Sequence, residues 1–186
     1  MASITITETT DGKKKRLGGI PLWAYVLLFI VQIPFRIIGL VLKLFVKGKK
    51  HIPVTDSSWT SWNSVNGHEI DRRIISETGF DGCIKFYELR TNENQIHELL
   101  KGKIFGEFHC ETNYGLFLRQ FDNPDDWPVS YLIFIDKSNV SLQRLKKTKS
   151  SWPDWKYESI NDKDFDIITE PGDTYTTKLN VRNNSH

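Results

Sequence analysis

The segment VSYLIFI, residues 129–135, is apolar on both faces of an extended chain except at Ser130. Successive side chains of a strand point to opposite faces of a sheet, so a strand with this pattern has both of its faces covered. We therefore expect residues 129–135 to form the central strand of a sheet. The turn residues 136–139 and the apolar residues of 140–145 predict an antiparallel partner directly after it.

The chain before this strand predicts a hairpin. Residues 103–111 alternate with a period of two, residues 112–113 are turn formers, and residues 114–121 (YGLFLRQF) return. The loop DNPDDWP at 122–128 ends the returning strand. Further strands are expected at 82–90 and in a last hairpin made of 165–169 and 174–181.

Two short helices are also expected. The first covers residues 66–79, because Asn66 with Glu69 three residues later resembles a capping box. The second covers residues 92–101, NENQIHELLK, with its apolar residues on one face. With about six to eight strands and two short helices, the predicted fold is an α+β domain dominated by antiparallel sheet.

A longer apolar run, IPLWAYVLLFIVQIPFRIIGLVLKLFV, covers residues 20–46. A membrane-spanning helix needs about 20 mostly apolar residues, and these 27 would make a helix about 40 Å long. The preferred prediction is therefore a single tilted span. In the alternative, the chain bends at Pro34, whose ring breaks the helical ladder, and both ends stay on one face of the bilayer as in a monotopic protein.

Basic residues flank the apolar run on both sides. Between Gly12 and Thr55 there are nine Lys or Arg residues and no acid, a pattern that favours an anionic leaflet. Because both ends carry about four, the positive-inside rule nearly cancels; we nevertheless expect the soluble domain to be cytoplasmic. The residues expected at the membrane interface are Trp23, Arg36, Lys43, Lys47, Lys49, Lys50, Trp59 and Trp62. For the last two, covering an edge of the domain is an equal alternative.

The predicted domain organisation follows from these segments: a disordered tail at 1–19, a membrane anchor at 20–50, a connector at 51–65, a soluble domain at 66–182 and a tail at 183–186. From His51 onward the chain has 16 basic and 21 acidic residues, which argues against nucleic-acid binding. The cysteines, Cys83 and Cys110, are expected to be unpaired and buried.

Glu107, His109 and Glu111 stand two residues apart on one predicted strand and would project from one face. Two carboxylates around an imidazole could hold a divalent metal or share a proton. The favoured interpretation is the exposed polar face of an antiparallel strand, with no metal and no cofactor. The sequence contains no Walker loop and no other recognised catalytic motif.

The best candidate for a binding surface is a basic loop that contains two tryptophans. Basic charge beside Trp suits an anionic membrane surface, although packing of the tryptophans into the core is favoured. The loop residues are Arg144, Lys146, Lys147, Lys149, Trp152 and Trp155.

These observations predict a membrane-anchored, non-catalytic interaction or accessory module that acts at a bilayer surface and binds an unidentified protein partner. One alternative is a metal-dependent hydrolase that uses Glu107, His109 and Glu111. Another alternative is a small accessory subunit of a larger membrane complex, in which other helices would cover the apolar run.

Overall fold

The computed structural model describes residues 3–12, 52–54, 58–65, 67–78, 83–172 and 175–184. All of them belong to one compact unit, which joins Met1–Gly12 to His51–His186 and leaves out Lys13–Lys50. The predicted membrane anchor at 20–50 therefore lies outside the described residues. Within the part of the chain that is described, no helix has the length and apolarity needed to cross a bilayer.

Antiparallel strands dominate the described residues, so the prediction of an α+β fold with two short helices is wrong. Every strand pairing among these residues is antiparallel. The elements are β1 (Ile4–Gly12), β2 (Ile52–Pro53), β3 (Thr60–Val65), β4 (His68–Thr78), β5 (Ile84–Thr91), α2 (Asn94–Leu100), β6 (Ile104–Glu111), β7 (Gly115–Phe121), the 3₁₀ turn η2 (Pro124–Asp126), β8 (Ser130–Asp136), β9 (Ser141–Thr148), β10 (Lys156–Ser159), β11 (Asp164–Glu170) and β12 (Tyr175–Asn183).

The helix expected at 66–79 is instead strand β4, which pairs with β3 on one side and β5 on the other. Val65 pairs with His68 in the β3–β4 hairpin, and the sequence between these two residues is Asn-Gly. Gly67 has a positive φ of 76°, which glycine adopts without steric cost. Asn-Gly between two strands is a strong hairpin signal, and it outweighs the resemblance to a capping box.

The other helix and the strands that were predicted within the described residues are confirmed. The helix at 92–101 is α2, whose first turn is capped by Glu93: its carboxylate accepts a hydrogen bond of 2.5 Å from the Ile96 amide. The strands predicted at 82–90, 103–111, 114–121, 129–135 and 140–145, and the hairpin at 165–181, correspond to β5 through β9 and to β11 with β12.

Strand β1 lies where a disordered tail was expected. Its nine residues pair with β12 from Ile4 opposite Asn183 to Gly12 opposite Tyr175. The side chains of Ile4 and Ile6 pack against the apolar cluster between the two sheets, because alternate residues of a strand share a face. The supposed connector at 51–65 likewise contains β3.

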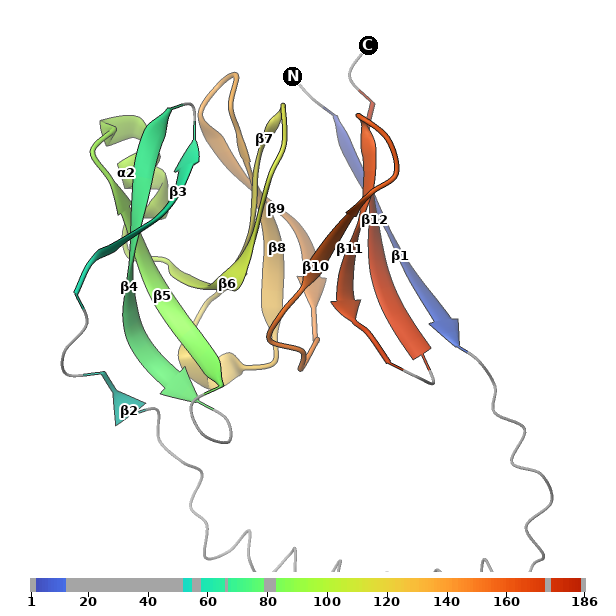
Figure 1. Cartoon of the computed structure of the whole chain (residues 1–186), viewed down its shortest axis with the longest axis horizontal. Helices are drawn as coiled ribbons and strands as arrows, with labels where there is room; N and C mark the ends of the chain where they lie inside the picture. Colours follow the sequence, from blue (N-terminus) through green and yellow to red (C-terminus); the bar gives the residue numbers. More distant parts are fainter. Residues whose placement is uncertain are drawn as a thin grey trace, which may run out of the picture. The chain divides into compact units, whose positions relative to one another are not determined.

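The strands form two sheets, one of four strands in the order β1-β12-β11-β10 and one of eight strands in the order β2-β4-β5-β6-β7-β8-β9, with β3 beside β4. Figure 1 shows β6 to β9 between the four-stranded sheet and the layer formed by β3, β4, β5 and α2. Strands β7 and β8 of this middle layer have a core on each face. Leu116 and Leu118 of β7 belong to one core and Phe117 to the other.

Because both faces of β7 and β8 are covered, all seven residues of β7 are buried, and so are six of the seven in β8. Strand β8 lies next to the edge strand β9 and not at the centre of its sheet, but the prediction that 129–135 has both faces covered is confirmed. The pattern of apolar residues on both faces is the sequence signature of such a strand.

We expect Gly115→Ala to lower the free energy of unfolding by about 3 kcal/mol, because overpacking a filled site costs this much. A Cβ at Gly115 would lie far inside van der Waals contact with the Ile135 carbonyl oxygen and the Phe134 ring. Denaturant unfolding of the full chain in detergent micelles measures the change. The matched control is Gly106→Ala, whose Cβ would meet a side-chain atom of Phe121 at 3.1 Å and should cost far less. Equal losses for the two variants would contradict the packing argument.

Candidate functional site

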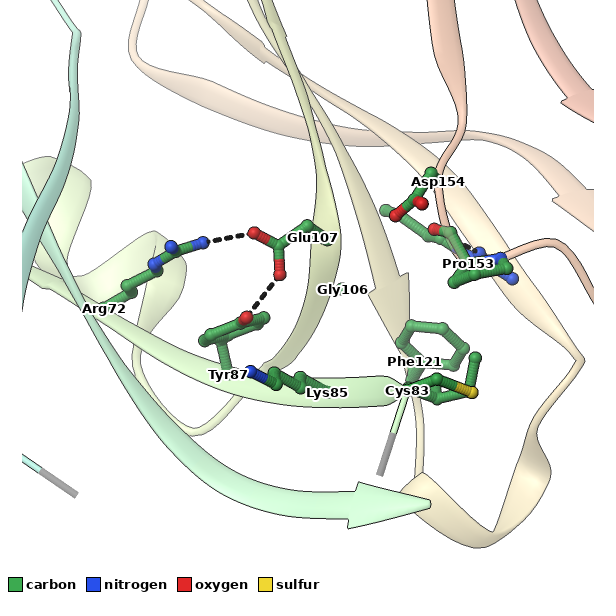
Figure 2. Close-up of a pocket in the computed structure, with 11 residues that line it drawn as sticks. Arg72, Cys83, Lys85, Tyr87, Gly106, Glu107, Phe121, Pro153 and Asp154 are labelled. Carbon is green, nitrogen blue, oxygen red and sulfur yellow. Dashed lines mark hydrogen bonds and ion pairs between the residues drawn. The ribbon is translucent and has the colours of Figure 1, made fainter. Parts of the chain in front are cut away.

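A pocket opens where strands β5 and β6 separate. These neighbouring strands pair at only one position, Tyr87 opposite Phe105, and beyond it the backbones diverge. The opening holds a cavity of about 330 Å³. Its walls include Arg72, Lys85, Tyr87, Glu107, Arg119 and Phe121. Figure 2 shows Arg72, Tyr87 and Glu107 on one side of the pocket and Phe121, Cys83 and Pro153 on the other.

A side-chain bridge crosses this opening. Arg72 of β4 donates a hydrogen bond of 2.7 Å to Glu107 Oε1 of β6, and the Tyr87 hydroxyl of β5 donates to Glu107 Oε2. The Arg72 guanidinium also lies over the rings of Tyr87, at 4.8 Å, and Trp62, at 5.8 Å. One carboxylate thus joins three strands at the place where the backbone hydrogen bonds between β5 and β6 are interrupted.

The contacts of the bridge shift the pKa values of Glu107 and Tyr87 in opposite directions. Burial raises the pKa of Glu107, but the hydrogen bonds from Tyr87 and Arg72 and the charge of Arg72 outweigh burial and hold that pKa below its ordinary value. Burial, together with the hydrogen bond to Glu107, raises the pKa of Tyr87. At neutral pH the bridge therefore consists of a carboxylate, a neutral phenol and a guanidinium.

A second cavity of about 220 Å³ lies next to the first. Arg72, Lys85 and Tyr87 line both cavities, and Ser58 and Thr60 add polar groups to the second one. These three shared side chains are therefore reachable from two adjoining spaces. The charged and polar groups of both cavities suit the binding of a small polar molecule.

Arg119 forms the inner wall of the larger cavity and is almost fully buried, with 2% exposure. Its Nη1 donates to Trp152 O at 2.6 Å, its Nη2 to Ser150 O at 2.7 Å and its Nε to the Ser130 hydroxyl at 3.0 Å. The guanidinium also lies 4.5 Å from the centre of the Trp155 ring. Burial lowers its pKa to about 9, so Arg119 keeps its charge at neutral pH.

Glu107, His109 and Glu111 do share the exposed face of β6, as predicted. Each has a different partner, however. Glu107 belongs to the bridge, and the His109 ring packs edge-on against the Trp62 ring with a distance of 4.6 Å between ring centres. Glu111 accepts a hydrogen bond of 2.8 Å from the Lys137 ammonium. Within the described ranges, no group of three or more His, Cys, Asp or Glu residues is placed to hold a metal ion. The hypothesis of a metal-dependent hydrolase finds no support in these contacts.

The predicted basic loop divides into exposed and buried parts. Trp155 is 5% exposed and packs against Phe108, so it belongs to the core, whereas Trp152 is 40% exposed. Most of the cations have partners within the unit: Arg144 pairs with Asp122, Lys146 pairs with Glu8 of β1, and Lys147 lies over the Tyr131 ring, while Lys149 is exposed. Since Trp152 and several of the cations are exposed, a membrane-surface role for these residues stays a prediction, whereas Trp155 is removed from it by burial.

Trp59 and Trp62 contact the domain itself. Trp59 lies under the guanidinium groups of Arg73 and Arg90, at 4.8 and 4.2 Å, and Trp62 packs on the core beside α2. These contacts favour the interpretation that both tryptophans cover an edge of the sheet. Trp23, Arg36, Lys43, Lys47, Lys49 and Lys50 lie outside the described residues.

The two cysteines differ in accessibility. Both are free, as expected, but Cys83 is exposed at the pocket and only Cys110 is buried. Burial raises the pKa of Cys110 to about 12, which makes this thiol unreactive at neutral pH.

No family model matches the chain, and comparisons with curated proteins and with solved structures found no significant match. Sequence reasoning singled out Glu107 but missed Arg72, Lys85, Tyr87 and Arg119. The signal for Arg119 was present, because a charge within the apolar run GLFLRQF of an inner strand needs buried partners.

We expect Glu107→Gln to lower the free energy of unfolding by about 1 kcal/mol at pH 7, the usual size of a partly exposed charged hydrogen bond. Since the folded-state pKa lies below the ordinary value of 4.5, this contribution is present above that value and is lost as the pH falls through the folded pKa. Denaturant unfolding between pH 7 and pH 3 should show the two proteins converging in acid. The control, Glu98→Gln, removes an exposed helical pair with Lys101. A difference that stays constant over this range would contradict the assignment.

We expect Arg119→Lys to lower the free energy of unfolding by about 2 kcal/mol, because one ammonium cannot replace a planar guanidinium that serves several carbonyls. Hydrogen exchange should also become faster in residues 149–155, which the guanidinium holds. Arg144→Lys, at an exposed pair with Asp122, is the control and should change stability by less than about 0.5 kcal/mol. Unchanged exchange in that loop would show that Arg119 does not hold it in place.

Proposed function

We propose that this protein is a monotopic, membrane-associated interaction module, in which residues 20–46 enter and leave the bilayer on the same face. The observation that carries the proposal is that the strands flanking this segment belong to one folded unit. Strand β1 ends at Gly12 and pairs with β12, while β2 begins at Ile52 and pairs with β4.

These pairings argue against a single crossing. It would place β1 on one side of the membrane and β12 on the other, and a backbone ladder of nine residue pairs cannot form across a hydrocarbon core about 30 Å thick. The tertiary pairing therefore favours the monotopic alternative over the tilted single span that the sequence alone favoured. The apolar run provides the affinity for the bilayer, and the β unit stays on one side of it.

Covalent reach keeps the β unit close to the membrane surface. Eight chain steps separate Gly12 from Ile20 and six separate Val46 from Ile52, which allow at most about 28 Å and 21 Å. The unit is therefore presented to partners at the bilayer surface.

The basic flanks support a cytoplasmic location for the β unit. In a single span, the two clusters of about four Lys or Arg would oppose one another under the positive-inside rule. When both clusters lie on the same face, their preferences add, and each charge near an anionic leaflet contributes about 1 kcal/mol. Nine basic residues without an acid then favour the cytoplasmic leaflet.

Binding is favoured over catalysis by the contacts of the site. The carboxylate of Glu107 is engaged by Arg72 and Tyr87, and Glu111 is paired with Lys137. What the unit offers instead is a preformed polar pocket. A protein partner or a larger membrane complex would meet it at the membrane surface.

The topology is tested by labelling with a membrane-impermeant maleimide in cells that express the full chain. Cys83 is the exposed native thiol and reports on the β unit. Thr7→Cys in a Cys83→Ser background reports on β1, whose Thr7 is exposed. We expect both positions to show the same protection before the membrane is opened and the same labelling afterwards, with full-length protein retained on membranes after a high-salt wash.

Leu28→Asp serves as the control for anchoring, because a charge in the apolar run is costly in hydrocarbon. This variant should move into the soluble fraction, and the cysteines at positions 7 and 83 should still be labelled to the same extent. Opposite protection of the two positions would overturn the monotopic topology. Release of the unmodified protein by salt alone would overturn membrane insertion.

A further inference from the structure

The pocket between β5 and β6 has two cations whose donors are not fully used. Arg72 gives one hydrogen bond to Glu107, and no other hydrogen bond of its guanidinium is formed with the described residues, although a guanidinium carries five N–H donors. Lys85 is exposed and makes no hydrogen bond or ion pair within the described ranges, while its charge acts on Glu107 through space. Both side chains line both cavities.

Glu107 does not cancel this excess of donors. Its two oxygens already accept from Arg72 and Tyr87, so it neutralises Arg72 without occupying the remaining N–H groups. Among the other lining charges, Lys85 and Arg119 are positive and Asp154 is negative. An anion that enters the pocket therefore meets a net positive charge.

The Arg72 guanidinium is also oriented in advance. The ion pair with Glu107 and the rings of Tyr87 and Trp62 hold it in place. Binding an anion therefore costs little side-chain entropy, which is the condition for useful affinity. Arginine binds phosphate and carboxylate groups through paired N–H donors, and a nearby lysine adds a point charge.

We infer that the pocket binds a small organic anion with a phosphate or carboxylate group, held by Arg72 and Lys85 where the two cavities adjoin. The volumes of about 330 and 220 Å³ exceed what inorganic phosphate fills. Phe121, Ile84 and Pro153 give the larger cavity an apolar wall for the rest of the molecule. The anion could come from a soluble metabolite or from a lipid headgroup, since the chemistry of recognition is the same.

Cys83 supplies a reporter at the site itself. It lines the pocket and is exposed, whereas Cys110, the second of the two cysteines, is buried. The rate at which a disulfide reagent modifies the full chain in neutral-detergent micelles thus reports on the pocket. We expect glycerol 1-phosphate, and more weakly inorganic phosphate, to slow this reaction in a saturable way, while glycerol has no effect.

Lys85→Gln should weaken this protection at least tenfold, and Arg72→Lys should weaken it while leaving the fold intact. Lys101→Gln removes the same charge from an exposed position on the chain segment after α2 and should bind like the unmodified protein. Absence of saturable protection, or equal protection in Lys85→Gln and Lys101→Gln, would overturn the proposal. Leu28→Asp, which is expected to be soluble, should show the same protection of Cys83 by the anion. A failure of the anion-binding proposal can therefore be distinguished from a failure of the proposed membrane association.

The source of the anion is distinguished by a second arm. Phosphatidylcholine vesicles containing phosphatidic acid are compared with pure phosphatidylcholine vesicles as competitors of glycerol 1-phosphate. A lipid headgroup is supported as the ligand if the vesicles with phosphatidic acid compete and the pure phosphatidylcholine vesicles do not. Protection by the soluble phosphate without such competition supports a soluble ligand. If none of these probes protects Cys83, the pocket is not an anion site.

Discussion

Backbone pairing between β1 and β12 is the constraint on which the arrangement of this protein depends. It joins residues near the two ends of the sequence, Ile4–Gly12 and Tyr175–Asn183, and it makes the apolar run an insertion within a folded unit. A ladder of this length is formed by water-excluding contacts of Ile4 and Ile6 as well as by hydrogen bonds. The proposed monotopic topology rests on this pairing.

A second consequence of sheet geometry is the site. Strands β5 and β6 share a single pairing position, so the sheet opens, and side chains take over the role of backbone hydrogen bonds. Arg72, Tyr87 and Glu107 come from three successive strands and meet across this opening. The bridge of Arg72, Tyr87 and Glu107 keeps the opening in shape. The unused donors of Arg72 and the ammonium of Lys85 then favour the binding of an anion.

Arg119 shows how the inner layer and the four-stranded sheet are connected. A charge in the most buried strand is tolerated because carbonyl groups of the loop at 149–155 and the ring of Trp155 surround it. The same contacts make that loop a wall of the pocket. Of the two tryptophans in the predicted membrane-binding surface, Trp155 is thus part of the core and Trp152 lies outside it.

Local patterns determined much of the secondary structure. The period of two in 103–111, the apolar residues on both faces of 129–135 and the capped helix at 92–101 depend on neighbours in sequence, and they predicted β6, β8 and α2. The expected helix at 66–79 was wrong because the Asn-Gly pair was overlooked, although it too is a local signal. The apolar and basic pattern of 13–50 likewise comes from sequence alone, and it carries the membrane hypothesis.

Only the tertiary structure decided which distant segments meet. The partner of β1 lies about 170 residues away, and a short run such as ITITETT does not indicate whether it pairs, or with which strand. Arg72, Lys85 and Glu107 are likewise unremarkable as separate polar residues, and they form a site only because the register of three strands places them around one opening. Sequence periodicity reports which face of an element is covered, but pairing between remote strands depends on the packing of the whole unit, and both the topology and the pocket follow from that packing.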